Sequence, residues 1–479
     1  MFPLSCMGSF KQWWSCEDTA VNERKVLSCV PFLPPLPTNS NVVDVLESAA
    51  NLARAIKLHQ TIDSHRQRRW ELSRIKLSGE DRSINELYIE QVGEEVQNTL
   101  VMLHGYGAGL AFWYKNYEAL SRPLGWRLYS LDLLGMGRSS RPPFQLQAKD
   151  EDGKIVEAEN WFIDALEEWR KQRGIERFTL MAHSLGGYMA VAYALKYPGH
   201  LKKLILVSPA GMSEDPNTIN ERIHESAEKT STMNDSTQHR DEETSASVKD
   251  ASILLETDIC EVKASPNTSE WHYPKWLAPL WDAKISPFTV LRWTGPFGPK
   301  IVSGWTSRRF SHLPTEEARA LHDYSYSLFI QPSSGEHALA CILTPRMFAR
   351  RPLIRRIQDV GRQYFQRQTT GSGTLESSHC ASLSTKMERE NGYPIVFFYG
   401  EDDWMDKEGG FAAQQKVLGL KRQMLKFATP EEKHADEGDA KVIIVPKAGH
   451  IVYLDGWEYF NRKVTEEMEG VSQREKERP

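Results

Sequence analysis

The stretch that decides the fold is AHSLGG at residues 182–187, taken together with its flanks. Residues 178–181 are apolar and predict a buried strand, and residues 188–195 predict a helix that ends near Pro198. A strand, a sharp turn with a serine at its tip and a helix form a nucleophile elbow, which lifts the serine hydroxyl above the sheet. The N-terminus of the helix also favours developing negative charge. We therefore expect Ser184 to be a nucleophile, with Ala182 where such turns usually carry glycine.

Short apolar runs alternate with helical stretches on both sides of this elbow. The runs predict strands at residues 85–92, 99–103, 127–131, 178–181, 204–209, 394–399 and 441–445. Such alternation predicts a mostly parallel, doubly wound sheet, and with the elbow at its centre the expected architecture is the α/β-hydrolase fold with an inserted helical cap. Helical periodicity is also present at residues 43–68.

Composition divides the chain into five parts. Residues 1–42, with a proline-rich run near their end, are expected to be a flexible leader, and residues 43–211 form the first part of the core. Residues 212–270 contain no aromatic side chain and are rich in polar ones, so we expect them to be largely disordered. Residues 271–388 begin with closely spaced aromatics and predict a helical cap with a polar linker. Residues 389–479 complete the core.

Bulk composition excludes several classes of function. The formal net charge of −5 and the pI of about 6.3 give no basic footprint for nucleic acid. The six cysteines contain no C-x-x-C pair, so neither a zinc site nor a disulfide framework is expected. We expect no transmembrane helix and no secretory signal, because no apolar stretch is long enough. The first sixteen residues lack acids, as mitochondrial presequences do, but Lys11 is their only base.

A serine nucleophile needs a base, an acid that orients the base, and donors for the oxyanion. In this fold the chain order is serine, acid, histidine, each just past the end of a strand. His450 follows the last predicted strand and is the expected base. The acid lies in the loop after residue 399, where the usual G-x-x-D spacing selects Asp403, with Asp406 as a second candidate and Asp402 as a third.

Two backbone regions are expected to form the oxyanion hole. One donor is the N–H of Leu185, directly after the serine, and the other comes from the HGYG loop at residues 104–107, in particular Gly105 and Tyr106. Glycines in that loop let the backbone approach a substrate carbonyl. This chemistry requires no metal and no organic cofactor.

Residues 450–455 also match H-x-x-x-x-D, a signature associated with glycerolipid acyltransferases. The same residues have a structural interpretation. Asp455 precedes the final predicted helix, residues 456–470, and Glu458 three positions later predicts a capping box with Asp455 as N-cap.

The chain resembles the lipid-directed α/β-hydrolases that include the α/β-hydrolase-domain proteins four and five and the fungal cardiolipin-specific deacylases. In the core the resemblance is carried by the elbow, HGYGAG at 104–109 with FW at 112–113, DLLGMGRSSRP at 132–142, and GH-x-VY-x-D at 449–455. In the cap it is carried by PFTVLRW-x-GPFGP at 287–299, PSSGE at 332–336 and ARRPL at 349–353. It spans residues 43–211 and 271–465.

The resemblance implies hydrolysis of phospholipid or lysophospholipid acyl esters, with acyltransfer credited to some members. One relative has lost its serine and acts as a lipase co-activator, so a non-enzymatic regulator of a lipase at a lipid surface is a further alternative, although Ser184 is present here. In that relative the acid aligns nearer Asp406, which keeps the choice of acid open.

The long insert after Met212 resembles the fungal members. This likeness implies deacylation of cardiolipin to monolysocardiolipin, in mitochondria and peripheral to the inner membrane. The cytoplasm and the lipid droplet surface are the alternative locations. The expected partner is a phospholipid at a membrane surface, and the aromatic cap is expected either to hold acyl chains and touch that surface or to form its own core.

Overall fold

The computed structural model describes residues 3–15, 17–33, 68–216, 281, 283, 285–345, 347–368 and 385–478. Residues 1–213 and 273–479 fold as one unit, and residues 214–272 are a separate one. The predicted helix at residues 43–68 and the predicted disorder of residues 212–270 lie, except at their edges, outside the described residues.

Within the described residues, eight strands form one sheet in the order β1-β2-β4-β3-β5-β6-β9-β10. β1 and β2 are antiparallel, β2 is antiparallel to β4, and the strands from β4 to β10 are parallel, which confirms the predicted α/β-hydrolase fold. The strands are β1 Arg68–Lys76, β2 Ser83–Gln91, β3 Asn98–Leu103, β4 Trp126–Leu131, β5 Phe178–His183, β6 Leu201–Val207, β9 Pro394–Gly400 and β10 Asp439–Val445.

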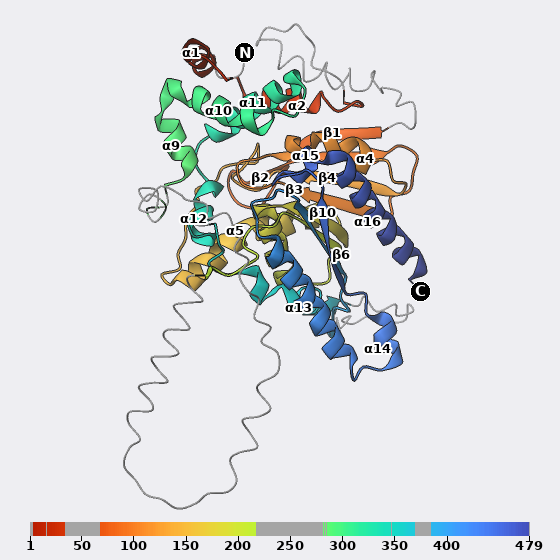
Figure 1. Ribbon diagram of the computed structural model, residues 1–479. Coiled ribbons are helices and arrows are strands. Elements are labelled where there is room, and N and C mark those ends of the chain that lie inside the picture. Colours follow the sequence, from red (N-terminus) through yellow and green to blue (C-terminus); the bar gives the residue numbers. More distant parts are fainter. Residues whose placement is uncertain are drawn as a thin grey trace, which may run out of the picture. The chain divides into compact units, whose positions relative to one another are not determined.

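Helices cover both faces of this sheet (Figure 1). Alternate side chains of one strand point to opposite faces, so Leu204 and Leu206 of β6 enter one core, whereas Ile205 and Val207 enter the other. The first core contains helices α5 Glu151–Gln172, α6 Leu185–Lys196 and α13 Lys407–Leu425. The second contains η2 Leu110–Trp113, α4 Tyr114–Leu120, α15 Val452–Asp455 and α16 Trp457–Glu477. α14 Pro430–Ala435 precedes β10.

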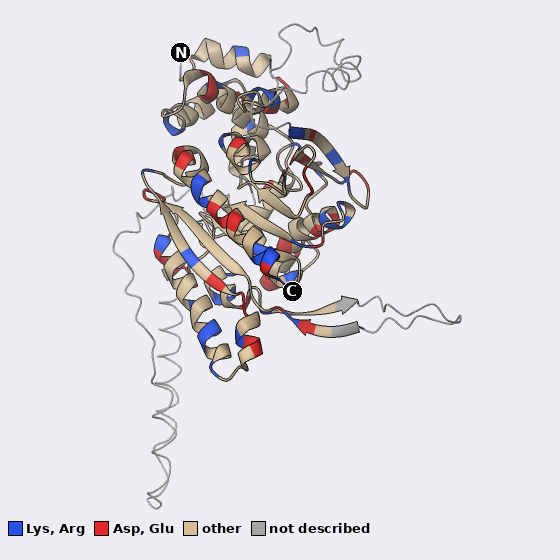
Figure 2. Cartoon of the chain, turned by 90° about the vertical axis from the view of Figure 1, so that its right-hand side faces the viewer, with Lys and Arg blue, Asp and Glu red and all other residues tan. Residues whose placement is uncertain are grey.

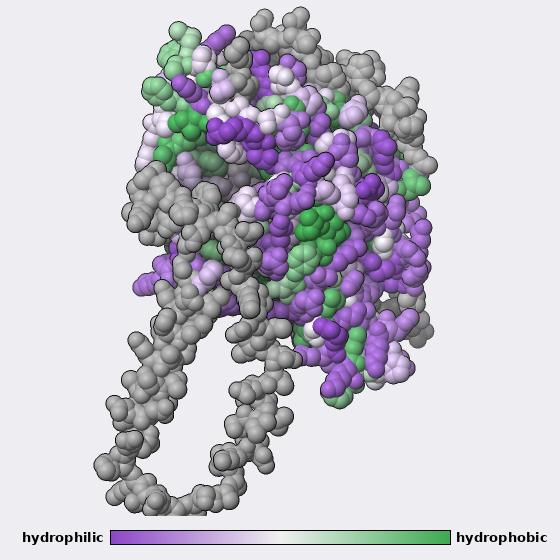
Figure 3. All heavy atoms as spheres, in the orientation of Figure 1, coloured by the Kyte–Doolittle hydropathy of each residue, from purple (hydrophilic) through white to green (hydrophobic). Residues whose placement is uncertain are grey.

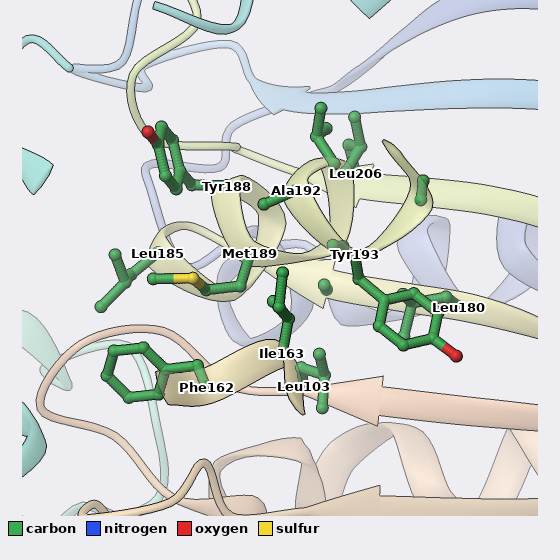
Figure 4. Close-up of a cluster of buried hydrophobic side chains, with 14 of the residues drawn as sticks. Leu103, Phe162, Ile163, Leu180, Leu185, Tyr188, Met189, Ala192, Tyr193 and Leu206 are labelled. Atoms are coloured by element: carbon green, nitrogen blue, oxygen red, sulfur yellow. The ribbon is translucent and has the colours of Figure 1, made fainter. Parts of the chain in front are cut away.

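The helix after the elbow lies at the centre of the first core. Leu185, Met189 and Tyr193 are buried side chains along α6 (Figure 4). In the same view they lie among Leu103, Leu180 and Leu206 of the sheet and Phe162 and Ile163 of α5. This packing fixes the end of α6 that follows Ser184, so the elbow rests on a rigid base.

The chain between β6 and β9 supplies a cap. Its described elements are α9 Pro287–Trp293, η3 Gly295–Phe297, α10 Gly298–Arg309, α11 Thr315–Phe329, η4 Gly335–His337, α12 Ala338–Ile342, η5 Leu353–Arg355 and η6 Ile357–Asp359. An antiparallel pair of strands follows, β7 Tyr364–Gln368 and β8 Thr385–Arg389, in a stretch where a polar linker was predicted.

The flexible-leader prediction is wrong for residues 3–15 and 17–33. These residues form α1 Cys6–Trp14 and α2 Thr19–Leu27. Ser5 and Asp18 cap the two helices, each accepting a hydrogen bond from a backbone N–H of the first turn. α2 packs on α11 and buries Val26 and Leu27 in the second core. Burial of apolar side chains against the cap outweighs the effect of the proline-rich run that follows.

No helix in the described ranges has both the length and the apolar character needed to cross a bilayer.

Candidate active site

Ser184 sits on a strained turn between β5 and α6. Its φ of 52° and ψ of −117° are unusual for a residue with a side chain, and backbone hydrogen bonds to neighbouring segments hold it there. The Ser184 N–H donates to the Val207 carbonyl at 2.9 Å, and the Ser184 carbonyl accepts from the Ala210 N–H at 3.0 Å. A Cβ at Gly186 would lie 2.5 Å from the His104 carbonyl oxygen, so only glycine fits there. Ala182 is buried, and its methyl group is accommodated.

The imidazole of His450 bridges Ser184 and Asp403. Its Nε2 lies 3.1 Å from Ser184 Oγ, and its Nδ1 lies 3.1 Å from Asp403 Oδ1. The structure therefore brings together the three side chains that the sequence nominated, although Ser184 lies more than two hundred residues before the other two. An imidazole held by a carboxylate at one nitrogen leaves the other free to accept a hydroxyl proton.

Asp403 is held as a carboxylate by three donors. Besides His450, the Ser208 hydroxyl donates to Oδ2 at 2.5 Å and the Met405 N–H donates to Oδ1 at 3.0 Å. Burial alone would raise the pKa of Asp403, but the hydrogen bond and charge of His450, with these other donors, hold it below its ordinary value. Ser208 was not among the residues predicted from the sequence; its only signal was its place directly after β6.

The two alternative acids point elsewhere. Asp406 is the N-cap of α13: its Oδ1 accepts from the Glu408 N–H at 3.0 Å, and its Oδ2 accepts from the Ser213 hydroxyl. Asp402 is exposed, and neither residue bonds to His450 among the described contacts. The geometry thus selects Asp403, as the G-x-x-D spacing favoured.

Two of the predicted oxyanion residues lie beside Ser184, Leu185 in the chain and Gly105 in space. Leu185 opens α6, so its N–H has no acceptor within the helix. The N–H of Tyr106 has no acceptor among the described residues. Gly105 is packed against the elbow: a Cβ there would lie 2.8 Å from His183 Nδ1 and 3.0 Å from Ser184 Cβ. Its role is therefore to let the loop approach the serine.

His104 fixes the peptide between Gly105 and Tyr106. Its Nε2 accepts from the Leu133 N–H at 3.0 Å, so its Nδ1 carries the proton and donates to the Gly105 carbonyl at 2.7 Å. Burial lowers the pKa of His104, which keeps the ring neutral and this pattern intact. With that carbonyl held, the Tyr106 N–H of the same planar peptide is held in the opposite direction.

His183 and Trp404 flank the ring of His450. His183 Nε2 donates to the His450 carbonyl at 3.0 Å, and burial, with the nearby His450, lowers its pKa so that it stays neutral. The Trp404 ring centre lies 4.7 Å from that of His450, and its side chain is half exposed. Neither residue was predicted from the sequence, although His183 directly precedes Ser184 and Trp404 directly follows Asp403.

The cap lies against the oxyanion loop. The Phe288 ring stacks on Tyr106 with centroids 4.9 Å apart, and it also stacks on Phe329 with centroids 4.5 Å apart. The cavity beside this loop, lined in part by Tyr106 and Phe288, measures only about 20 Å³. An acyl chain needs far more space, so side chains that line this cavity, Phe288 among them, would have to move for a lipid to occupy it.

Asp455 does not cap the final helix, and the capping-box prediction is wrong. The N-cap of α16 is Gly456, and α16 extends beyond the predicted end to Glu477. Asp455 instead receives two hydrogen bonds from Arg309 of α10, at 2.8 and 2.9 Å, and one from the Gly449 N–H at 3.0 Å. A bidentate arginine contact outcompetes a local cap, and it ties the cap to the loop that carries His450.

Fold and site together define an α/β hydrolase, and comparison with known proteins agrees. A family profile for the alpha/beta hydrolase fold matches residues 98–257. A "1-acylglycerol-3-phosphate O-acyltransferase" of Arabidopsis thaliana is 30% identical over 384 residues, which cover 79% of this chain and 68% of the relative. The "1-acylglycerol-3-phosphate O-acyltransferase ABHD5" of Rattus norvegicus is 28% identical, with 77% and 76% covered. A "(Lyso)-N-acylphosphatidylethanolamine lipase" of Homo sapiens is 27% identical, with 78% and 79% covered. The chain belongs to the ABHD family of lipid hydrolases.

Proposed function

We propose that the protein is a serine hydrolase that cleaves acyl esters of phospholipids, with Ser184 as nucleophile, His450 as base and Asp403 as the acid. The observation that carries the proposal is the His450 ring, 3.1 Å from both the serine hydroxyl and the carboxylate. Three further features support it: the buried carboxylate of Asp403, the neutral ring of His104, and the backbone N–H groups of Leu185 and Tyr106, for which no acceptor is found among the described residues.

The proposed reaction has two halves. Ser184 Oγ attacks the ester carbonyl while its proton passes to His450 Nε2, and the oxyanion accepts hydrogen bonds from Leu185 and Tyr106. The C–O bond of the lipid breaks, and His450 returns its proton to the departing alcohol. Water then loses a proton to His450 and attacks the acyl-enzyme. The fatty acid leaves, and the proton returns to Ser184.

The narrower substrate we propose is cardiolipin, converted to monolysocardiolipin at the mitochondrial inner membrane. The polar insert after residue 212, which resembles that of the fungal deacylases, supports this choice. A fluorescent fusion distinguishes mitochondria from the cytoplasm and lipid droplets.

A second candidate is transfer of the acyl group to a lysolipid hydroxyl instead of water. The names of the plant and ABHD5 relatives favour it. The H-x-x-x-x-D pattern does not add support, because its histidine already contacts Ser184 and Asp403 and its aspartate binds Arg309.

The test is incubation of the purified full chain with mixed mitochondrial phospholipids, followed by mass spectrometry. We expect cardiolipin to fall, monolysocardiolipin and free fatty acid to rise, and Ser184→Ala to abolish all three changes. Unchanged cardiolipin beside falling phosphatidylcholine would overturn the substrate but keep the mechanism. Product that forms only when an acyl donor and lysophosphatidic acid are both supplied would favour acyltransfer. A cellular effect retained by Ser184→Ala would favour a non-enzymatic regulator.

A further inference from the structure

The cavity beside the oxyanion loop has polar groups in its lining that the proposed reaction does not use. Tyr106, Arg141, Phe288 and Glu336 are among the residues that line it, and we call it the polar cavity. Arg141 belongs to the segment between β4 and α5, and Glu336 lies in η4 of the cap. Three separate parts of the chain therefore meet at the polar cavity, directly beside a proposed oxyanion donor.

Arg141 is a cation that pairs with no carboxylate among the described residues. Its guanidinium donates to the Gln331 side chain at 2.8 Å and to the carbonyls of Gly135, Pro332 and Gly137 at 2.8, 3.0 and 3.2 Å. All these acceptors are neutral, and an arginine has one more N–H group than they engage. Burial lowers the pKa of Arg141 from 12.5 to about 10, so the side chain is charged at neutral pH although burial disfavours the charge.

The one carboxylate that lines the polar cavity is already neutralised. Arg292 donates to both oxygens of Glu336, at 2.5 and 3.2 Å, and the Ser286 hydroxyl donates to the same carboxylate at 2.5 Å. Two arginines and one glutamate leave a single positive charge, that of Arg141, beside the polar cavity. A buried charge is unfavourable unless it is paired. The polar cavity therefore favours an anion as its ligand.

The hydroxyl of Tyr106 offers a second donor. Its oxygen is buried and has no hydrogen-bond partner among the described residues. Ser286, whose hydroxyl lies near it, donates to Glu336 instead. Burial, and after it the charge of Glu336, raises the pKa of Tyr106, so the hydroxyl keeps its proton. The backbone N–H groups of Gly107 and Gly137, which also line the polar cavity, likewise have no acceptor in the described ranges.

This preference for an anion is local. The formal net charge of the chain is −5, and in Figure 2 basic (blue) and acidic (red) residues are interspersed. Hydrophobic (green) atoms gather at the upper left of Figure 3, where Figure 1 places α9 and α10 of the cap. A broad basic field would attract any anion, whereas one fixed cation beside an apolar cap favours an anion that is attached to apolar groups.

The polar cavity lies where the phosphate of a lipid would stand during cleavage of its ester. In a glycerophospholipid, two oxygens and two or three glycerol carbons separate the ester carbon from the phosphorus. Tyr106 spans a similar distance between its backbone N–H, the proposed oxyanion donor, and its hydroxyl. A single residue can therefore contact the ester and the phosphate of one lipid at the same time.

We propose that the polar cavity binds the phosphodiester of the substrate lipid, with the Arg141 guanidinium and the Tyr106 hydroxyl as donors. The inference rests on the proposed function and names the group by which the substrate is recognised. Because the polar cavity measures only about 20 Å³, side chains that line it, Phe288 among them, move when the phosphate enters.

The test compares two soluble esters, dihexanoylphosphatidylglycerol and dihexanoylglycerol, which differ in the phosphodiester. Both are used below their critical micelle concentrations. We expect the wild-type chain to have the higher kcat/KM for the phosphodiester, chiefly through a lower KM. Arg141→Gln should reduce the ratio of the two kcat/KM values on the order of 10- to 100-fold, because a hydrogen bond to a charged group is lost. Arg141→Lys keeps the charge without the planar fork and should fall between the two.

Tyr106→Phe tests the same site without breaking a hydrogen bond inside the chain. It keeps the ring and the backbone N–H and removes only the hydroxyl, which has no partner among the described residues. We expect the ratio of kcat/KM values to fall by about tenfold. Thermal unfolding of every variant verifies folding, which matters most for Arg141→Gln because its carbonyl contacts are lost.

Arg389→Gln is the matched control. Arg389 also donates to a backbone carbonyl, that of Arg362 at 3.2 Å, but it does not line the polar cavity. We expect its ratio of kcat/KM values to stay within about twofold of wild type. Variants of Arg141 and Tyr106 that slow both esters equally would overturn the phosphate site, as would a wild-type chain with no preference for the phosphodiester.

Binding measurements separate this inference from the proposed function. Ser184→Ala, with and without Arg141→Gln, is titrated with dihexanoylphosphatidylglycerol and with inorganic phosphate in a calorimeter. A chain that cleaves neither ester but binds the phospholipid through Arg141 contradicts only the proposed function. A chain that hydrolyses dihexanoylglycerol through Ser184, yet binds the phospholipid equally well without Arg141, contradicts only the phosphate site. Inorganic phosphate that binds as tightly as the phospholipid would overturn the assignment to a lipid and favour free phosphate.

Discussion

Asp403 and Asp406 lie three residues apart and offer a sharp test of the site. In Asp403→Asn the side-chain amide would donate to His450 Nδ1, which forces the proton onto Nε2, the nitrogen that now faces Ser184 Oγ at 3.1 Å. That nitrogen could no longer accept the serine proton. The wrong tautomer lowers kcat by roughly 10³ to 10⁴ in a comparable serine–histidine–aspartate site, equivalent to about 4–5 kcal/mol in activation free energy.

Asp406→Asn is the matched control. Asp406 caps α13 and bonds to Ser213, and asparagine is also a good N-cap, so we expect kcat within about twofold of wild type and a change in unfolding free energy below about 1 kcal/mol. The assay is hydrolysis of a soluble ester, with circular dichroism to verify folding. If the Asp406 variant lost activity as severely as the Asp403 variant, or if Asp403→Asn kept its rate, the reasoning would be refuted.

Three further perturbations follow from buried or stacked groups. Burial, and after it the charge of Asp132, raises the pKa of Glu23 from 4.5 to about 7. The stability that the neutral carboxyl contributes is therefore fully present below pH 4.5 and is lost as the pH rises through 7. Glu23→Gln should therefore increase stability at pH 8 by on the order of 3 kcal/mol and flatten the pH dependence in urea titrations; an unchanged profile would contradict this assignment. Arg309→Ala leaves the carboxylate of Asp455, which is 9% exposed, without its bidentate partner, so we expect a loss of about 3 kcal/mol in unfolding free energy. A thermal midpoint equal to that of wild type would contradict a stabilising role of the Arg309–Asp455 contact. Phe288→Ala should lower the unfolding free energy by about 2 kcal/mol yet speed the hydrolysis of bulky soluble esters several-fold. Slower hydrolysis of a bulky ester, with unchanged stability, would contradict the view that the Phe288 ring blocks the site.

Features that depend only on residues close together in the chain could be predicted from the sequence. The elbow around Ser184 combines a buried strand, a serine turn and a helix within twenty residues, and each central strand is a short apolar run. His450 could be predicted because it lies in the short loop that follows β10. The G-x-x-D spacing favoured Asp403 but left two other acids open, because the choice depends on which carboxylate meets His450 Nδ1, a contact between two separate loops.

Contacts between distant segments explain the wrong predictions. Asp455 and Glu458 match a capping box, yet Arg309, 146 residues earlier, takes the carboxylate. The proline-rich run near residue 35 suggested a flexible leader, although α1 and α2 before it have ordinary N-caps and bind the cap. β1 was missed because its alternating charged and apolar residues belong to a half-exposed edge strand, whose pattern is weaker than that of the buried strands.

The most direct measurement is reaction of the folded full chain with a fluorophosphonate, followed by peptide mass spectrometry. A hydroxyl whose proton can pass to His450 should react readily, giving a single phosphonyl adduct on Ser184 that disappears in Ser184→Ala and falls steeply in Asp403→Asn. A folded, vesicle-bound protein that takes up no label, or an adduct on a different residue, would contradict the claim that these three side chains work as one.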